Sequence, residues 1–203
     1  MKKNIAILIS GTGSNMEALI KATQGDGDSL AHIACVISDK VDAKGLLTAQ
    51  ELGIKTYFID PSGYESKQAY EAILHQTFLK HHIDFICLAG FMRLMSAYLC
   101  DLWQHKMINI HPSLLPAFKG LDTYQKAIEA GVKFSGCTVH YVSEKMDSGK
   151  IIAQAVVPVL WNDTPNMLAK RILSAEHKLY PLTLKALCNE ELYNQTLSFY
   201  QAV

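Results

Sequence analysis

Short apolar runs alternate with stretches of helical periodicity over the first two thirds of the chain. The runs consist almost entirely of Ile, Val, Leu, Cys and Ala, which is typical of strands buried on both faces of a parallel sheet. Strands are predicted over 4–9, 31–37, 55–59, 84–89 and 107–110, and helices over 16–23, 44–52, 66–81, 96–103 and 124–130. This βαβα order predicts an α/β fold with helices on both faces of a mostly parallel sheet.

The order of elements changes after Gly136. Two apolar runs, 137–142 and 151–160, follow one another without a helical stretch between them. Strands joined by so short a connection pair in antiparallel order, so the sheet is predicted to be mixed. The chain of 203 residues contains no repeats and no long polar linkers, and we expect a single domain.

A long helix is predicted near the end of the chain. Thr164 has the residue type of an N-cap, and Pro165 suits the first helical position because its missing N–H would have no partner there. The apolar spacing continues to about Leu187. Pro181 lies inside this stretch and predicts a bend.

Composition narrows the class of protein. Hydrophobic residues make up 49% and charged residues 19%, which excludes global disorder. The balance of 19 basic and 19 acidic residues argues against a nucleic-acid partner, and no run approaches the roughly 18 apolar residues of a membrane span. Five cysteines without a CxxC pair, and an apolar run at Ile5–Ile9 too short for a signal peptide, predict a cytoplasmic protein.

The first predicted strand ends in a glycine-rich loop, Ser10–Asn15, that leads directly into a helix. Gly11 and Gly13 allow the backbone N–H groups to approach a ligand, and the helix start adds unpaired donors that suit a phosphate. Met16 stands where a dinucleotide fingerprint requires its third glycine, so a small phosphate ester is the better guest. The alternative is a tight strand–helix turn without a ligand.

Asn109 and His111 end a predicted strand. They are two residues apart, so their side chains share one side of the strand, and Pro112 places both at its carboxyl end. Ligands bind at that edge of open α/β sheets. An amide and an imidazole side by side can stabilise an oxyanion, but a histidine that only caps the strand fits the local pattern equally well.

Asp147 lies in the turn Ser143–Gly149 between the last two predicted strands. Asp and Gly are favoured in turns for local backbone reasons, which is the plainer explanation of Asp147. However, if the preceding strand lies beside the strand of His111, the carboxylate would keep that imidazole protonated and oriented.

Three histidines, His75, His81 and His82, lie at a polar helix end. No pattern of carboxylate partners accompanies them. We therefore expect solvated side chains and no metal site.

Four segments together carry a resemblance to a known family. They are Gly11–Asn15, Ala89–Arg93, the highly specific Asn109–Pro116 and Met146–Gly149. With them the chain resembles the folate-dependent formyltransferases along essentially its whole length, to Pro181. The resemblance implies a Rossmann-like domain over residues 1–203, with a phosphate-binding half over 1–103 and a catalytic and folate half over 104–203.

The resemblance also implies the reaction. The formyl donor would be 10-formyltetrahydrofolate, as cosubstrate, and the acceptor would be the primary amine of glycinamide ribonucleotide, in purine biosynthesis. Asn109, His111 and Asp147 would be catalytic, without a metal. The protein would be a monomer or homodimer that acts on small molecules.

By analogy, the ribonucleotide side comprises Gly13, Ser14, Asn15, Met16, Glu17 and Glu176. Apart from the resemblance, Glu176 has the pattern of a solvated charge beside a core stripe. The folate side comprises Lys67, Met92, Arg93, Leu94, Met95, Asn109, Ser143, Glu144, Lys145, Met146 and Asp147.

The chain departs from the family pattern at a few positions. Lys67 replaces a frequent arginine, Met146 a frequent leucine, and Asp122 and Tyr124 stand where many relatives carry histidines. An Arg-to-Lys change keeps the charge but loses the two-pronged hydrogen bonding of the guanidinium.

Three rival functions remain. A tRNA-formylating member is expected to carry a further basic C-terminal domain, and a formyltetrahydrofolate hydrolase an N-terminal regulatory domain. A non-enzymatic mononucleotide-binding module would explain the glycine loop, but it gives no reason for Asn109, His111 and Asp147 to occur together.

Overall fold

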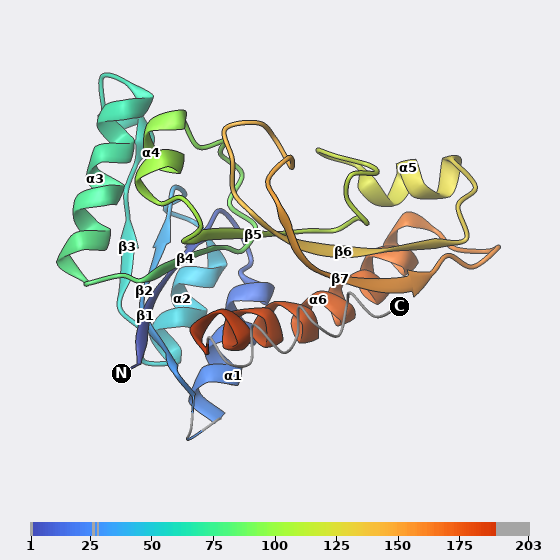
Figure 1. Ribbon diagram of the computed structural model, residues 1–203, viewed down its shortest axis with the longest axis horizontal. Helices are drawn as coiled ribbons and strands as arrows, with labels where there is room; N and C mark the ends of the chain where they lie inside the picture. The colour runs from blue at the N-terminus through green and yellow to red at the C-terminus, as the bar shows by residue number, and fades with distance from the viewer. Residues whose placement is uncertain (1, 26, 28, 190–203) are drawn as a thin grey trace.

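The computed structural model describes residues 2–25, 27 and 29–189. These residues are built around a single β-sheet (Figure 1). The sheet has seven strands in the order β3-β2-β1-β4-β5-β6-β7. The strands are β1 (Lys3–Ile9), β2 (Ala31–Ser38), β3 (Thr56–Phe58), β4 (Phe85–Leu88), β5 (Met107–His111), β6 (Phe134–Tyr141) and β7 (Ile151–Pro158). The predicted α/β class is confirmed.

The first five strands are parallel, and β6 and β7 are antiparallel to their neighbours. The chain builds outward from β1 to β3 and then crosses to place β4 on the other side of β1. The strand order therefore reverses between β1 and β4. Such a switch point is where open α/β sheets bind ligands, beyond the carboxyl ends of the strands.

The predicted start of β6 was wrong by three residues, because Gly136 does not end the run but lies inside the strand. It pairs with Val156 across the sheet. A Cβ atom at Gly136 would lie 1.9 Å from the carbonyl oxygen of Ala155. The glycine therefore permits close packing of two strands rather than a turn.

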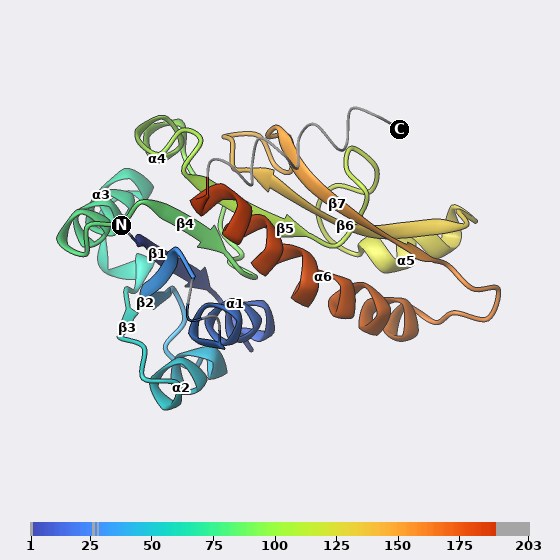
Figure 2. The same cartoon turned by 60° about the horizontal axis from the view of Figure 1, so that its bottom comes forward.

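Helices cover both faces of the sheet. The helices are α1 (Ser14–Gly25), α2 (Lys44–Glu51), α3 (Lys67–Lys80), α4 (Ala97–Leu102), α5 (Thr123–Glu129) and α6 (Pro165–Cys188), with a short 3₁₀ turn, η1 (Pro61–Gly63). Helices α1, α2 and α6 contribute to the hydrophobic core on one face, and α3 and α4 to a second core on the other (Figure 2). No helix among the described residues is long and apolar enough to cross a membrane.

Two of the three histidines expected to be solvated have aromatic partners. The indole N–H of Trp103 donates to His75 at 3.2 Å, and His81 Nε2 lies 2.6 Å from the hydroxyl of Tyr57. The expectation was wrong for these two because the partners come from other elements. Only His82 is exposed, as expected.

Helix α6 packs on the sheet and is hydrogen-bonded to the central strands β4 and β5. It begins as predicted, with the Thr164 hydroxyl accepting from Met167 N, and runs through Pro181 as one helix. The buried hydroxyl of Tyr180 lies 3.1 Å from the carbonyl oxygens of both Leu88 and Ile108, in β4 and β5. One side chain thus connects α6 to two adjacent strands.

Replacement of Tyr180 by Phe removes this donor from two buried carbonyl groups. We expect the free energy of unfolding to fall by about 1–2 kcal/mol, the usual effect of losing a buried hydrogen bond. Urea denaturation measures the change, and Tyr64→Phe serves as the matched control. Equal stability of the two variants would contradict the assignment.

Candidate active site

A cavity of about 470 Å³ opens at the carboxyl ends of β4 and β5. It is lined by Asn15, Leu88, residues 90–95, residues 109–112, residues 120–124, His140, residues 142–143, residues 146–147 and Glu176. The segments that line it are far apart in the sequence, and the sheet brings them together.

Strand β5 delivers Asn109 and His111 to this cavity, on one side of the strand as predicted. Ile110, between them, borders the cavity but is buried in the core that α6 covers. In the antiparallel pairing with β6, Asn109 lies opposite His140, and His111 lies opposite Thr138. The pairing therefore places a second imidazole beside the predicted amide.

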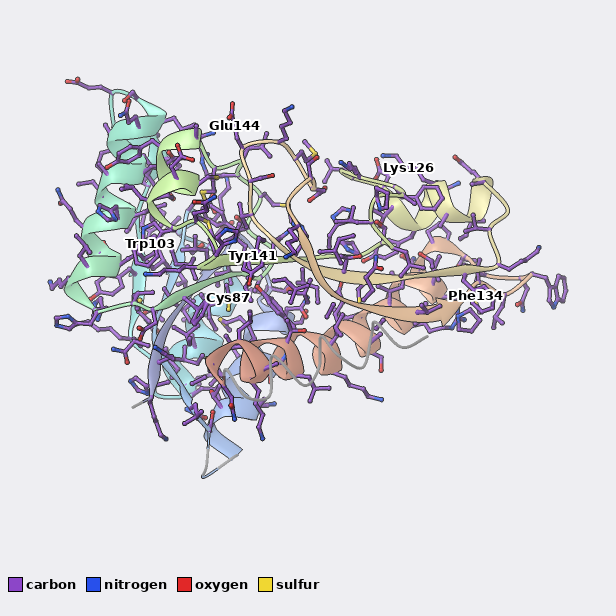
Figure 3. The ribbon with its side chains drawn as sticks, in the orientation of Figure 1. Cys87, Trp103, Lys126, Phe134, Tyr141 and Glu144 are labelled. Carbon is purple, nitrogen blue, oxygen red and sulfur yellow. The ribbon has the colours of Figure 1, made fainter. Side chains whose placement is uncertain are left out.

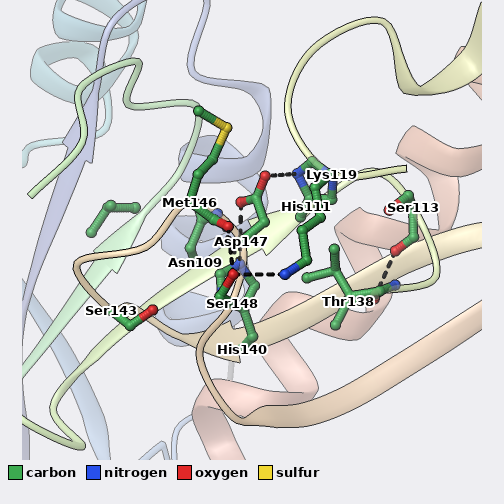
Figure 4. Close-up of polar contacts among 12 residues, drawn as sticks. Asn109, His111, Ser113, Lys119, Thr138, His140, Ser143, Met146, Asp147 and Ser148 are labelled. Carbon is green, nitrogen blue, oxygen red and sulfur yellow. Dashed lines mark hydrogen bonds and ion pairs between the residues drawn. The ribbon is translucent and has the colours of Figure 1, made fainter. Parts of the chain in front are cut away.

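The carboxylate of Asp147 lies beside the imidazole of His111 in the wall of the cavity (Figure 4). Its Oδ2 atom lies 3.4 Å from His111 Nδ1 and accepts a hydrogen bond from the Gly120 N–H at 2.9 Å. Asp147 adopts a left-handed backbone conformation, with φ of 46°, which is uncommon for a residue other than glycine. The plainer explanation, a turn residue alone, is therefore wrong: Asp147 forms the turn and contacts the imidazole.

Both ring nitrogens of His111 face acceptors. Nε2 lies 3.0 Å from the carbonyl oxygen of Phe118, and Nδ1 faces Asp147. Only a doubly protonated ring can donate to both at once. The side chain is 6% exposed, so the surroundings of the ring are set by the protein rather than by solvent.

His140 was missed by the sequence reasoning. Its Nδ1 lies 2.9 Å from the Tyr141 carbonyl oxygen, so Nδ1 carries a hydrogen, and Nε2 of the neutral ring can accept from Asn109 Nδ2 at 3.2 Å. Burial lowers the pKa of His140, which favours that neutral ring. His140 thereby fixes the orientation of the Asn109 amide. The only advance signal was the strand register, which the sequence alone did not supply.

The glycine loop forms a second, smaller cavity of about 210 Å³. It is lined by residues 10–15, Ala89, Gly90 and Met92. Gly13 has φ of +76°, and a Cβ there would lie 3.0 Å from the Cα of Gly45 at the start of α2. The loop thus needs glycine both for its backbone conformation and for close approach.

Of the residues predicted to bind the ribonucleotide at the glycine loop, some line the small cavity and others do not. Ser14 and Asn15 line the small cavity with Gly13. Met16 is fully buried in the core, and Glu17 forms an ion pair with Lys21 at 2.5 Å, so neither side chain lines the cavity.

Glu176 is buried, with 4% of its surface exposed, and the pattern of a solvated charge was misleading. Its Oε2 accepts from Asn15 Nδ2 at 2.8 Å. Burial raises the pKa of Glu176, and the hydrogen bond from Asn15 partly opposes that shift. Glu176 continues a series at every fourth position, with Ile172 before it and Tyr180 after it, and this series was the available signal.

Of the residues predicted to bind the folate, most line the large cavity and a few do not. Met92, Arg93, Leu94 and Met95 line the large cavity with Ser143, Met146 and Asp147, whereas Lys67, Glu144 and Lys145 do not. Met92 and Leu94 are 70% and 49% exposed, while Met95 is buried.

Tyr124, one of the departures from the family pattern, also lines the large cavity. Burial, together with the nearby Glu176, raises its pKa to about 12. Its hydroxyl is therefore a neutral donor near neutral pH.

Comparison with known proteins identifies the family of the chain. A family model described as formyl transferase matches residues 3–184. The chain belongs to the formyl transferase family. Within the family it is 41% identical over 185 residues to the phosphoribosylglycinamide formyltransferase of Bacillus subtilis, covering 91% of this chain and 94% of that protein.

Two further comparisons give similar identities. The chain is 45% identical over 184 residues to the trifunctional purine biosynthetic protein adenosine-3 of Bos taurus, which is 91% of this chain but 18% of the length of that protein. The crystal structure of phosphoribosylglycinamide formyltransferase from Brucella melitensis superposes with a TM-score of 0.90 at 47% identity, covering 93% of this chain and 97% of that one.

Replacement of Glu176 by Gln is expected to stabilise the protein at pH 8. The folded state raises the pKa of this carboxyl group, so its stabilising contribution is present at low pH and is lost as the pH rises through the folded pKa. Urea denaturation at pH 8 and pH 4 measures the effect, which should vanish at pH 4. The exposed Glu144→Gln is the control, and a gain at pH 8 no larger than that of the control would contradict the burial argument.

His140→Gln tests the opposite sign. The folded state lowers the pKa of His140, so the unfolded chain takes up its proton first, and stability falls as the pH drops below about 6.5, by at most about 1.4 kcal/mol per pH unit. The glutamine variant lacks this part of the loss. Denaturation of both proteins at pH 7.5 and pH 5.5 gives the difference, and identical pH dependence would show that folding does not lower the pKa of His140.

Proposed function

We propose that the chain transfers the formyl group of 10-formyltetrahydrofolate to the primary amine of glycinamide ribonucleotide, giving the N-formyl product and tetrahydrofolate in purine biosynthesis. The observation that carries this proposal is that His111 and Asp147 are in contact and that they line, together with Asn109, one cavity that adjoins a phosphate-sized one. Relatives of similar length carry the corresponding name.

The two cavities suit two substrates. They share Asn15, Gly90 and Met92, so a molecule held in one reaches into the other. The glycine loop and the start of α1 offer backbone N–H groups to the phosphate of the ribonucleotide. Its other end then lies toward Glu176, whose carboxylate can accept hydrogen bonds from hydroxyl or amine groups.

The folate fits the apolar side of the large cavity. Met92 and Leu94 present exposed apolar surface there, which a flat pterin ring would cover. Arg93 lies over the ring of Tyr70, 5.6 Å from its centroid, and supplies a cation beside this surface for the acidic end of the folate. Lys67, outside the cavity wall, could reach only a part of the cosubstrate that extends beyond the cavity.

The reaction needs charge stabilisation and one proton transfer. The neutral amine nitrogen attacks the formyl carbon, the carbonyl oxygen becomes an oxyanion, and the bond from carbon to N10 of the folate then breaks. The amide hydrogen of Asn109 that is not bound to His140 would donate to the oxyanion. The Nδ1–H of His111, whose contact with Asp147 is long at 3.4 Å, would be shared between that carboxylate and the oxyanion. Asp147, directly or through water, would move the proton from the attacking amine to N10.

We also propose that the protein works in the cytoplasm, as a monomer or homodimer. All five cysteines are buried and unpaired, which supports a reducing compartment.

The direct test is an assay of 10-formyltetrahydrofolate consumption with and without glycinamide ribonucleotide. Consumption that requires the amine supports the proposal, and formate release without the amine would instead establish a hydrolase. Heat of binding with the ribonucleotide but no turnover would favour a binding module.

Asn109→Ala and His111→Ala are expected to lower kcat by about 10²-fold or more, the usual effect of losing an oxyanion donor. Both substrates should still bind, as measured by calorimetry. His32→Ala, at an exposed histidine of β2, is the control. Turnover of the Asn109 or His111 variants at the rate of this control would remove the mechanism.

A further inference from the structure

The segment Phe118–Asp122, between β5 and α5, contacts the proposed catalytic residues His111 and Asp147 on one side and Lys126 on the other. The Phe118 carbonyl oxygen lies 3.0 Å from His111 Nε2, and the Gly120 N–H donates to Asp147 at 2.9 Å. These two backbone groups orient both members of the ion pair. The position of this short segment therefore decides where the imidazole and the carboxylate lie.

The other edge of the segment faces Lys126. The ammonium group donates to the Leu121 carbonyl oxygen at 2.6 Å and to that of Lys119 at 3.4 Å. Lys126 lies in the last turn of the short helix α5 (Figure 3). It forms no ion pair with a carboxylate among the described residues, so these carbonyl groups are its hydrogen-bond partners there.

One peptide group connects the two edges. The carbonyl oxygen of Lys119 and the N–H of Gly120 belong to the same planar unit, so Lys126 and Asp147 bind its opposite ends. A cation at the oxygen and an anion at the N–H both align with the dipole of this unit. Each contact therefore strengthens the other.

The segment has two other anchors: the Lys119 ammonium group donates to the Ser148 hydroxyl at 2.6 Å, and Phe118 packs against the core. Phe118, Gly120 and Asp122 all have left-handed backbone conformations, with φ of 53°, 77° and 59°. Such conformations are unfavourable for Phe and Asp and persist only where the surroundings impose them. The Asp122 side chain makes no capping bond to α5, and Leu121 is 73% exposed, so neither side chain holds the segment in place.

We propose that Lys126 is a positioning residue for the reaction: it holds the Lys119–Gly120 peptide group, which in turn sets the position of Asp147 against His111. This inference rests on the proposed function, because it assigns a role to Lys126 in formyl transfer. Lys126 itself does not touch the substrates.

Lys126→Met is expected to lower kcat about fivefold to tenfold, as for the loss of a hydrogen bond from a charged donor, with both KM values within about twofold. Lys126→Gln keeps a neutral donor and should fall between Met and wild type, and Lys126→Arg should restore most of kcat. The neighbouring exposed residue Gln125, replaced by Met, is the matched control for effects on α5 alone.

A second measurement does not depend on activity. The amide proton of Gly120, which donates to a carboxylate, is expected far downfield in the ¹H–¹⁵N spectrum and to move upfield in Lys126→Met and Lys126→Gln but not in Lys126→Arg or Gln125→Met. If Lys126→Met does not fold, as judged by circular dichroism, the Arg and Gln variants still provide the comparison.

The outcomes separate the two proposals. Wild-type protein that transfers no formyl group overturns the proposed function, whatever the spectrum shows. Active wild-type protein whose Lys126 variants match Gln125→Met in kcat, with the Gly120 amide proton unmoved, overturns the role of Lys126 alone.

Discussion

Four residue pairs join β5 to β6 in antiparallel order, from Ile108 opposite Tyr141 to His111 opposite Thr138. This pairing sets Asn109 against His140 and turns the chain after β6 back toward the end of β5, so that the loop before β7 brings Asp147 to His111. The parallel part of the sheet cannot do this, because its loops run to helices on the faces. One reversal of strand direction therefore assembles the candidate catalytic groups.

The site is assembled by burying groups that would be more stable in water. His111, His140 and Glu176 are each at most 6% exposed, and burial shifts the pKa values of His140 downward and of Glu176 upward. Each buried group is balanced by a partner with a hydrogen bond to offer or accept, as physical chemistry requires of polar groups away from solvent. The candidate site thus gives up stability for a fixed orientation of donors, a common relation between stability and function.

The two cavities adjoin because of the topology of the sheet. Reversal of strand order between β1 and β4 leaves the glycine loop next to the segment after β4, and Gly90 and Met92 line both cavities. In the proposed function, a ligand at the helix start and a ligand on the apolar wall of the larger cavity would approach one another near Asn109. Transfer of a small group between two bound molecules requires such proximity.

Local sequence determined most of the elements. The apolar runs, the glycine loop, the polar pair Asn109 and His111 and the Thr164–Pro165 helix start are short-range patterns, and each was found where predicted. The errors came from contacts between elements: Gly136 inside a strand, Glu176 within the buried face of α6, His75 and His81 with aromatic partners. Which side chains meet across strands depends on register and on the packing of one element against another. Tertiary structure alone therefore decided that His140 orients Asn109 and that Lys126 is hydrogen-bonded to the peptide group that binds Asp147.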